Sequence, residues 1–312
     1  MTFFSIFVVL VIEQLKAAPA ARVQGWLDAY ARFLERQFNG GERRHGVTAW
    51  GVGVAVPTLC VLGLQVGLDM LHAVLTFLFS VAMLYFLMGF RQFSHFFTDI
   101  QLALRAGEIE RARTLFHAWT GRESSRLSAT EIVRLTIEDG ILASHRHVFA
   151  PLFWFMLLGP AGALLYRLSV AMNQREAAPA APESGFAIPC DAFGEFSRQA
   201  FEFLDWLPAR LTAVTFAIVG DFEDAIYCWR TQAQQWHDAA AGILLASGAG
   251  ALGVKLGQPL PEALGVEERP ELGMGDEADI DHLQSAIGLV WRALVLCLLL
   301  LVLLTLASWV GS

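Results

Sequence analysis

Long runs of apolar residues separated by charged loops are the feature that most limits how this chain can fold. The runs cover residues 2–14, 47–68, 71–90, 148–172 and 287–310. All but the first are long enough to cross about 30 Å of hydrocarbon as an α-helix. The chain is also 55% hydrophobic and only 17% charged, a composition typical of integral membrane proteins. We therefore predict an all-α, polytopic membrane helix bundle that forms one integral membrane domain over residues 1–312.

Three shorter apolar segments need a separate interpretation. Residues 2–14 have no basic residue before their apolar part, so they predict a short retained membrane helix and not a signal peptide. Residues 206–220 are short and carry Arg210, while residues 239–257 are dominated by Ala, Gly and Ser. Small residues let helix backbones approach closely. These last two segments are expected to be half-spans or re-entrant elements.

Lys and Arg residues are unevenly distributed among the loops. Six lie in residues 16–44 and eight in residues 91–146, whereas residues 173–205 hold two. Cytoplasmic loops of membrane proteins are enriched in Lys and Arg. We therefore predict a multi-pass protein of the bacterial inner membrane whose basic loops lie in the cytoplasm, with residues 91–147 as a helical insert and residues 173–205 as a loop.

Apolar residues at helical spacing predict amphipathic helices over residues 22–38 and 98–119. Ser128 and Glu131 have the spacing of a capping box, which predicts that a helix begins there and continues through Ile141. Residues 258–276 are rich in Pro, Gly and Glu and are expected to form a loop.

Composition and missing motifs exclude several classes of function. The net charge of −8 gives no basic surface for nucleic acid, so the lipid bilayer is the expected macromolecular partner. The four cysteines lack the spacing of a zinc site or a disulfide framework and are expected to be free thiols. No Walker-type, HExxH or GxSxG motif occurs.

Polar residues near the predicted membrane boundaries are the remaining candidates for a site. An ionisable group inside a membrane segment costs roughly 2.5–3.5 kcal/mol on insertion scales and is a functional candidate by default. Guanidinium groups match carboxylate and phosphate oxygens, so several of them together would bind an anionic metabolite. The candidate ligand-binding residues are Arg122, Glu138, His145, Arg146, His147, Arg167, Arg210 and Lys255. The acidic candidates are Glu13, Asp139, Glu202, Asp205 and Asp279, and no metal-ligand set is predicted.

Purely structural interpretations remain open for these residues. Residues 145–147 could extend towards lipid headgroups, and Glu13 could face headgroup water. Arg134 and Glu138 are four residues apart and could form an ordinary exposed pair worth a few tenths of a kcal/mol. Arg210 lies inside an apolar run, where an unpaired guanidinium is costly, and is favoured to line a polar cavity.

The order of several short strings resembles the CobD/CbiB membrane family of cobalamin biosynthesis, the adenosylcobinamide-phosphate synthases, together with AmpE-like relatives. The strings are residues 103–113, 121–122, 150–155, 159–163, 166–167, 207–213 and 250–257. They extend along nearly the whole chain. In this family the resemblance implies an ATP- and Mg²⁺-dependent joining of a corrinoid carboxylate to an aminopropanol phosphate, with formation of an amide.

The resemblance also assigns positions. Glu13, Glu138 and Asp279 fall where the family has acidic residues, and the basic character of the family is kept at Arg122, Arg167, Arg210 and Lys255. The acidic stretch that precedes the family's Val-Val-Ala-Pro is replaced here by residues 142–147, which end in His145, Arg146 and His147. Mg²⁺ prefers oxygen ligands, so cations at these positions would repel it.

These departures favour a diverged member with an AmpE-like regulatory or altered role, which binds an anionic or corrinoid small molecule in a basic pocket. His145 or His147 would be pH-sensitive neighbours of that pocket. The alternative is an active adenosylcobinamide-phosphate synthase that holds Mg²⁺ through other acids. A third hypothesis is a structural membrane scaffold in which the basic residues serve topology alone.

Overall fold

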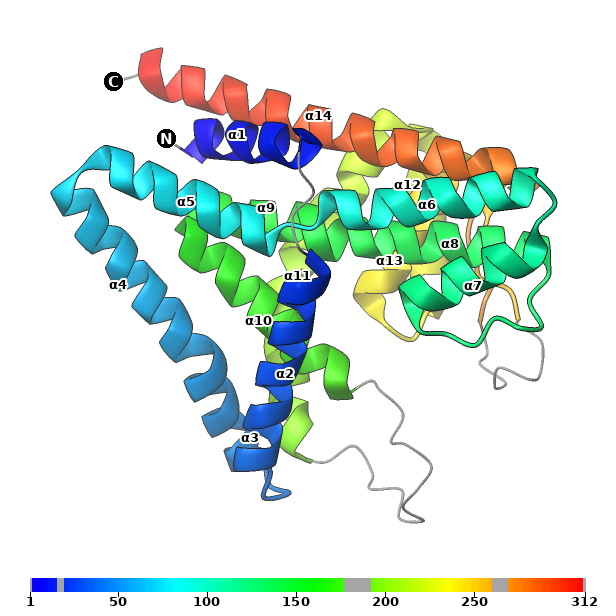
Figure 1. The fold of residues 1–312 in the computed structure, drawn as a ribbon. Coiled ribbons are helices and arrows are strands. Elements are labelled where there is room, and N and C mark those ends of the chain that lie inside the picture. The colour runs from blue at the N-terminus through cyan, green and yellow to red at the C-terminus, as the bar shows by residue number, and fades with distance from the viewer. Residues whose placement is uncertain (1, 16–19, 177–191, 260–268, 311–312) are drawn as a thin grey trace. The chain divides into compact units, whose positions relative to one another are not determined.

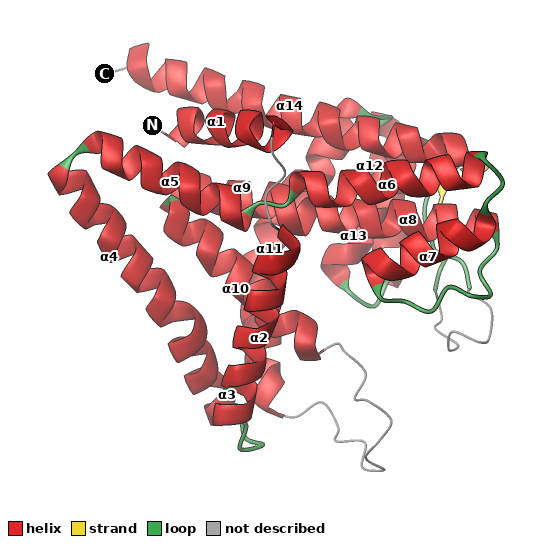
Figure 2. Ribbon diagram, viewed as in Figure 1, coloured by secondary structure: helices red, strands yellow, loops and turns green. Residues whose placement is uncertain are grey.

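The structure is a computed structural model that describes residues 2–15, 20–176, 192–259 and 269–310. The described residues are almost entirely helical, and their strands are limited to β1 (Val254–Lys255) and β2 (Asp276–Glu277) (Figure 2). The predicted all-α fold is therefore confirmed. The chain separates into two compact units: unit 1 is Met1–Gly89 with Arg146–Leu207, and unit 2 is Phe90–His145 with Pro208–Ser312.

Unit 1 is built from helices of both halves of the sequence. They are α1 (Thr2–Leu15), α2 (Ala20–Phe38), α3 (Arg43–Trp50), α4 (Val56–Leu71), α5 (Ala73–Leu87), α9 (Ala150–Leu158), α10 (Pro160–Glu176) and the first part of α11 (Ala192–Val219). A π-helical segment, Gly51–Ala55, joins α3 to α4. Helices α4 and α5 form a hairpin with a one-residue turn at His72, whose Nδ1 accepts a hydrogen bond from the backbone N–H of Val74 (Figure 1).

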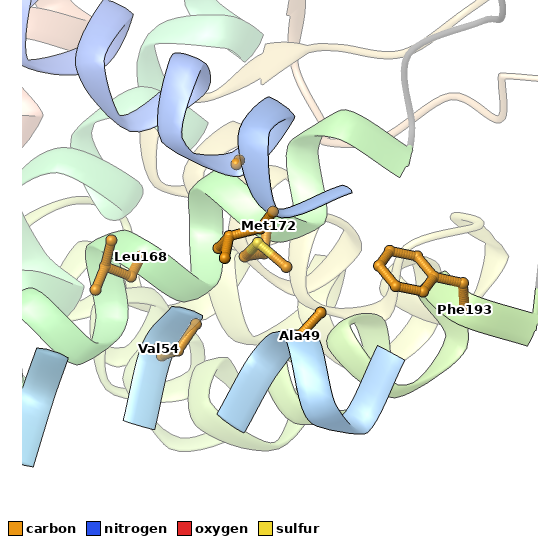
Figure 3. Packing of buried hydrophobic residues seen from close by; sticks show 7 residues of the cluster. Ala49, Val54, Leu168, Met172 and Phe193 are labelled. Carbon is orange, nitrogen blue, oxygen red and sulfur yellow. The ribbon is translucent and has the colours of Figure 1, made fainter. Parts of the chain in front are cut away.

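A small hydrophobic core holds α2, α3, α10 and α11 together. Ala49, Val54, Leu168, Met172 and Phe193 converge in it (Figure 3). Burying a large aliphatic or aromatic side chain stabilises a fold by about 1.5–3 kcal/mol. The core therefore fixes the start of α11 against α3.

Unit 2 contains the remaining helices. They are α6 (Phe90–Arg105), α7 (Ile109–Thr120), α8 (Ala129–Ser144), α12 (Phe222–Gln232), α13 (Ala239–Leu252), α14 (Ile280–Val310) and the last part of α11. Both α8 and α13 are buried along most of their length. The Ala, Gly and Ser content of α13 explains its close packing, because a Cβ added at Gly250 would lie 2.5 Å from the carbonyl oxygen of Asp224 in α12.

Strands β1 and β2 pair in parallel after α13, with Val254 opposite Asp276. An antiparallel bridge between Leu256 and Leu272 extends this contact. The end of the predicted loop over residues 258–276 thus pairs with residues 254–256, which come directly after α13. Residues 260–268 of this loop lie outside the described residues.

Three helices are long and apolar enough to cross a membrane, namely Arg43–Leu71, Ala129–Leu158 and Ile280–Ala307 among the described residues. Shorter apolar helices are Phe3–Glu13, Ala73–Leu87 and Ala239–Leu252. The predicted span over residues 148–172 does not form one helix. It is broken at Gly159, which has φ +65° between α9 and α10. The assignment of spans, half-spans and loops in the sequence analysis stays a prediction.

The predicted amphipathic helices differ in outcome. Helix α2 confirms the one over residues 22–38. The one predicted over residues 98–119 is two helices, α6 and α7, because Gly107 adopts φ +75° between them. Glycine adopts this left-handed conformation without the steric cost that other residues pay.

The cysteines agree with the expectation of free thiols where they are described. Cys60, Cys228 and Cys297 are free, and Cys190 lies outside the described residues. Burial is the largest cause that raises the pKa of Cys228 to about 11, and the nearby Asp224 raises it further. This thiol is therefore protonated at neutral pH and poorly reactive.

Replacing Ser128 by Ala is expected to destabilise the protein by about 0.5–2 kcal/mol. The predicted capping box is present at the start of α8: the Ser128 hydroxyl accepts from the Glu131 N–H, and the Glu131 carboxylate accepts from the Ser128 N–H at 2.7 Å. Chemical denaturation of the purified protein in detergent would measure the loss. Thr130→Ala, at an exposed position of the same helix turn, is the control, and an equal loss in both variants would contradict a capping role.

Candidate functional site

A buried carboxylate lies at the centre of the polar residues of unit 2. Helix α8 places Glu138 where only 2% of its surface is exposed. Its Oε2 accepts a hydrogen bond from Nη2 of Arg269, and its Oε1 accepts one from the backbone N–H of Gly257 at 2.8 Å. A buried charge is costly unless it is paired and hydrogen-bonded. Glu138 therefore fixes two separate parts of the segment that follows α13.

Two buried arginines accompany Glu138. Arg134, one helix turn before it, is 6% exposed and donates from Nη1 to Oε1 of Gln258 at 2.6 Å. Its Nε and Nη2 atoms are buried and have no hydrogen-bond partner among the described residues, and the same holds for Nη1 of Arg269. The Arg269 guanidinium also lies over the Trp236 ring, 5.4 Å from the ring centroid. These unused donors can bind carboxylate or phosphate oxygens.

Further polar contacts extend from Arg134 through Gln258 and Glu271 to Lys255. Lys255 forms an ion pair with Glu271, with 3.2 Å between Nζ and Oε1. The Gln258 side chain, which accepts from Arg134, donates to the other Glu271 oxygen at 3.2 Å. Lys255 is partly exposed, so it faces solvent from the edge of the cluster.

A glycine at position 257 allows the segment after α13 to pack closely against Pro270. Gly257 has φ +75°, and a Cβ added to it would lie 2.0 Å from the carbonyl oxygen of Pro270. Gln258 follows with φ +67°, the one non-glycine residue with a positive φ in the described chain. Side chains other than glycine pay a steric cost in this region. The strained backbone thus coincides with the residues that contact Glu138 and Arg134.

We use the name Glu138 cluster for Arg134, Glu138, Lys255, Gly257, Gln258, Arg269 and Glu271. Two residues of the sequence prediction, Glu138 and Lys255, belong to it. Arg122 and Asp139 form a separate ion pair at 3.2 Å.

The other predicted residues of unit 2 have structural partners. His145 is fully buried and shares a hydrogen bond of 3.0 Å with the Thr212 hydroxyl. Asp279 accepts from the backbone N–H groups of Asp281 and His282, which caps the start of α14. Burial raises the pKa of Asp279, but hydrogen bonds from His282 outweigh it and the net pKa is lowered. Arg210 is half-buried in α11 and interacts with a neighbouring group.

Unit 1 holds a second buried polar group. Arg167 in α10 is 3% exposed and contacts Nδ1 of His147 at 2.5 Å and Oε1 of Gln24 at 2.9 Å. Because Arg167 donates, His147 accepts through an unprotonated Nδ1. Next to Arg167 in the chain, the Tyr166 hydroxyl donates to Asp205 at 2.7 Å.

The remaining predicted residues of unit 1 are Glu202, Glu13 and Arg146. Glu202 is exposed and pairs with Arg198 one helix turn away, an arrangement of little energetic weight. Glu13 is buried at the end of α1, and Arg146 is half-buried beside His147. The prediction that all these cations share one basic pocket stays a prediction.

The sequence analysis did not identify five residues of the Glu138 cluster, namely Arg134, Gly257, Gln258, Arg269 and Glu271. The structural alternative of an exposed pair between Arg134 and Glu138 is wrong because both side chains are buried. Arg269 lies 131 residues from Glu138 in a segment that composition marks only as a loop. Arg134 carried no signal of its burial either, since Glu131, Arg134 and Glu138 share one polar strip of α8, as they would in an exposed pair.

Among the described residues, no group of three or more His, Cys, Asp or Glu side chains is placed to hold a metal ion. The adjacent Glu138 and Asp139 carboxylates are occupied by Arg269 and Arg122. Mg²⁺ is usually held by one or two carboxylates together with waters and substrate phosphates. The described residues do not form a preformed Mg²⁺ site, and we assign no step to this ion.

The fold and the site define the class of protein: an α-helical membrane protein with buried charged residues within its helices. The family model described as "CobD/Cbib protein" matches residues 7–290. The chain belongs to the CobD/CbiB family.

Relatives with assigned names support this membership. The chain is 34% identical over 308 residues to "Cobalamin biosynthesis protein CobD" of Stutzerimonas stutzeri, with 96% of each chain covered. It is 35% identical over 228 residues to the protein of that name from Chromobacterium violaceum, with 71% of each covered. The Photorhabdus laumondii protein is 30% identical over 270 residues, covering 84% of this chain and 82% of the relative. No solved structure matches the fold.

Proposed function

We propose that this protein acts in cobalamin biosynthesis as an ATP-dependent enzyme that joins a corrinoid carboxylate to an aminopropanol phosphate. Family membership and the names of the relatives support this function. They favour it over the AmpE-like regulatory role, which was the main hypothesis from the sequence. One of the strings that resemble the family, residues 250–257, ends at Gly257, whose backbone N–H donates to Glu138.

The observation that carries the proposal is the pair of buried guanidinium groups with unused donors beside Glu138. Arg134 has two such nitrogens and Arg269 has one. Each reactant of the proposed reaction carries a carboxylate or a phosphate, and charge-assisted hydrogen bonds to such groups contribute about 1.5–3 kcal/mol each. Arg134 and Arg269 would bind and orient an anionic group, while Glu138 holds Arg269 in place.

The amine nitrogen of aminopropanol phosphate forms a C–N bond with the corrinoid carboxyl carbon, and one carboxylate oxygen leaves. That oxygen is transferred to a phosphorus atom of ATP, which is cleaved, and the ammonium group gives up its extra protons to solvent. The cations of the Glu138 cluster would offset the negative charge that accumulates when two anionic reactants and ATP approach each other.

We also propose a location for the site. The excess of Lys and Arg in residues 16–44 and 91–146 supports a bacterial inner-membrane protein with these two loops in the cytoplasm. The start of α8 belongs to the second of these loops, so the Arg134 end of the Glu138 cluster would face the compartment that contains ATP. Labelling of single cysteines introduced at exposed positions of α7, with an impermeant maleimide on intact cells, tests this orientation.

Complementation tests the proposed function. We expect the gene to restore corrinoid amide formation in a bacterial strain that lacks its own synthase. Arg134→Ala should raise the KM for the anionic substrate about 10- to 100-fold, since it removes one or two charge-assisted hydrogen bonds. Arg134→Lys should recover only part of the loss, because a lysine cannot reproduce the forked guanidinium geometry.

The matched control is Arg111→Ala, which removes an exposed arginine of unit 2 that pairs with Glu108. This variant should complement as well as the unchanged protein. Failure of the unchanged protein to complement, despite its presence in the membrane, would argue against the synthase function. Full activity of Arg134→Ala would instead remove the Glu138 cluster from substrate binding.

A further inference from the structure

Unit 1 contains a cavity that the proposed reaction does not use. It has a volume of about 210 Å³ and is lined by residues of α1, α4, α5, α9 and the first residue of α10. One water needs only about 10–15 Å³ of such volume, so the cavity has room for several waters or for an ion with part of its hydration shell. It lies near the turn of the α4–α5 hairpin, because Asp69 and Ala73 flank that turn.

Oxygen atoms dominate the polar lining of this cavity. The polar residues are Ser5, Gln65, Asp69, Thr76 and Ser80. Among the described residues, those that line the cavity include one carboxylate, from Asp69, and no Arg, Lys or His. Hydroxyl, amide and carboxylate oxygens are the ligands that hard cations prefer. The charge of the lining excludes an anion and favours a cation.

Two of these oxygens lack partners. Oε1 of Gln65 and Oγ1 of Thr76 are buried and have no hydrogen-bond partner among the described residues. A buried polar atom without a hydrogen-bond partner destabilises the fold, so a ligand that satisfies it is favoured. Gln65 can offer only lone pairs through Oε1, so whatever satisfies this atom must be a hydrogen-bond donor or a cation.

The break between α9 and α10 also borders the cavity. Gly159 lies directly against the Gln65 amide, since a Cβ added to it would be 2.6 Å from Nε2. Gly159 and Pro160 both line the cavity. Irregular backbone at membrane depth is tolerated where it lines a wet cavity, and broken helices of this kind form ion sites in transporters. The C-terminal end of α9 and the N-terminal end of α10 meet here with opposite partial charges, so Asp69 sets the net charge.

We propose that this cavity is a binding site for a small monovalent cation, with Asp69 as the charged ligand and Gln65 and Thr76 as neutral ligands. The site is separate from the Glu138 cluster, and the two proposals can fail independently. If the basic loops lie in the cytoplasm, the α4–α5 turn lies on the opposite face of the membrane. The cation would then come from outside the cytoplasm, where sodium is the obvious candidate.

Cation-dependent thermal unfolding tests this proposal on the full chain in detergent. Replacing choline chloride by an equal concentration of NaCl should raise Tm by about 2–4 °C at saturation, as expected for a ligand that binds only the folded state. Equal salt concentrations keep electrostatic screening constant. A comparable rise with KCl instead of NaCl would support the site and identify potassium as its ion.

Variants separate the site from general salt effects. Asp69→Asn and Thr76→Val should each remove at least half of the cation-dependent rise in Tm, while Asp99→Asn, at an exposed position of α6, should keep it. Binding of radiolabelled sodium to the same preparations should fall in parallel, from about one ion per chain. An equal Tm in all three salts, or a sodium response unchanged in both Asp69→Asn and Thr76→Val, would overturn the proposal.

Discussion

Replacing Glu138 by Ala is expected to destabilise the protein by about 3–5 kcal/mol, because it leaves the buried Arg269 guanidinium without its counter-charge. Both side chains are buried, at 2% exposure for Glu138 and 8% for Arg269. The same change removes the acceptor of the Gly257 N–H, which adds to the loss. Chemical denaturation in detergent, followed by circular dichroism, measures the difference. Glu138→Gln should lose most of the same stability, since the amide keeps the volume and loses the charge.

A double replacement distinguishes the ion pair from simple loss of packing. Exchanging a buried ion pair for apolar residues of similar volume is often neutral or stabilising. Glu138→Met with Arg269→Met should therefore recover at least half of the stability lost in Glu138→Met alone. The double variant should nevertheless fail to complement, because the unused Arg269 donor is gone. Additive losses from the two single replacements would show that the pair is not coupled.

Replacing Gly257 by Ala is expected to cost at least about 2 kcal/mol and to impair complementation. The left-handed backbone alone costs a non-glycine residue about 1–2 kcal/mol. The added Cβ would also lie 2.0 Å from the Pro270 carbonyl oxygen, and this backbone atom cannot move without displacing the Arg269 segment.

Gly121 provides the matched control. It has φ +71°, similar to the value at Gly257, but a Cβ added there meets no atom within 4 Å. Gly121→Ala should therefore show the conformational cost alone, and the excess loss in Gly257→Ala measures the close approach. Equal losses of stability in both variants would mean that the segment after α13 is free to move away from Pro270.

Local features of the fold could be predicted from the sequence because their signals are local. The capping box needs only the three-residue spacing of Ser128 and Glu131, and the apolar runs mark most of the long helices. The break at Gly107 was not foreseen, since a glycine inside a helical pattern can either be tolerated or end a helix. The break at Gly159 poses the same difficulty.

The site was only partly predictable because its contacts are long-range. Glu138 and Lys255 were identified from charge and from the family resemblance, but their partners were not. The spacing of Arg134 and Glu138 fits an exposed helical pair as well as a buried one, and only tertiary packing distinguishes them. Arg269 contacts Glu138 across 131 residues of sequence, a separation that no local pattern can predict.

The most direct test of the account is detection of the product. The purified protein in lipid nanodiscs would be incubated with a corrinoid carboxylate, aminopropanol phosphate, ATP and Mg²⁺, and mass spectrometry would monitor the amide. We predict that the amide forms only when ATP is present, at a rate lowered at least about tenfold by Arg134→Ala at subsaturating substrate and unchanged by Arg111→Ala. Absence of the amide, under conditions in which a relative from cobalamin biosynthesis forms it, would contradict the account.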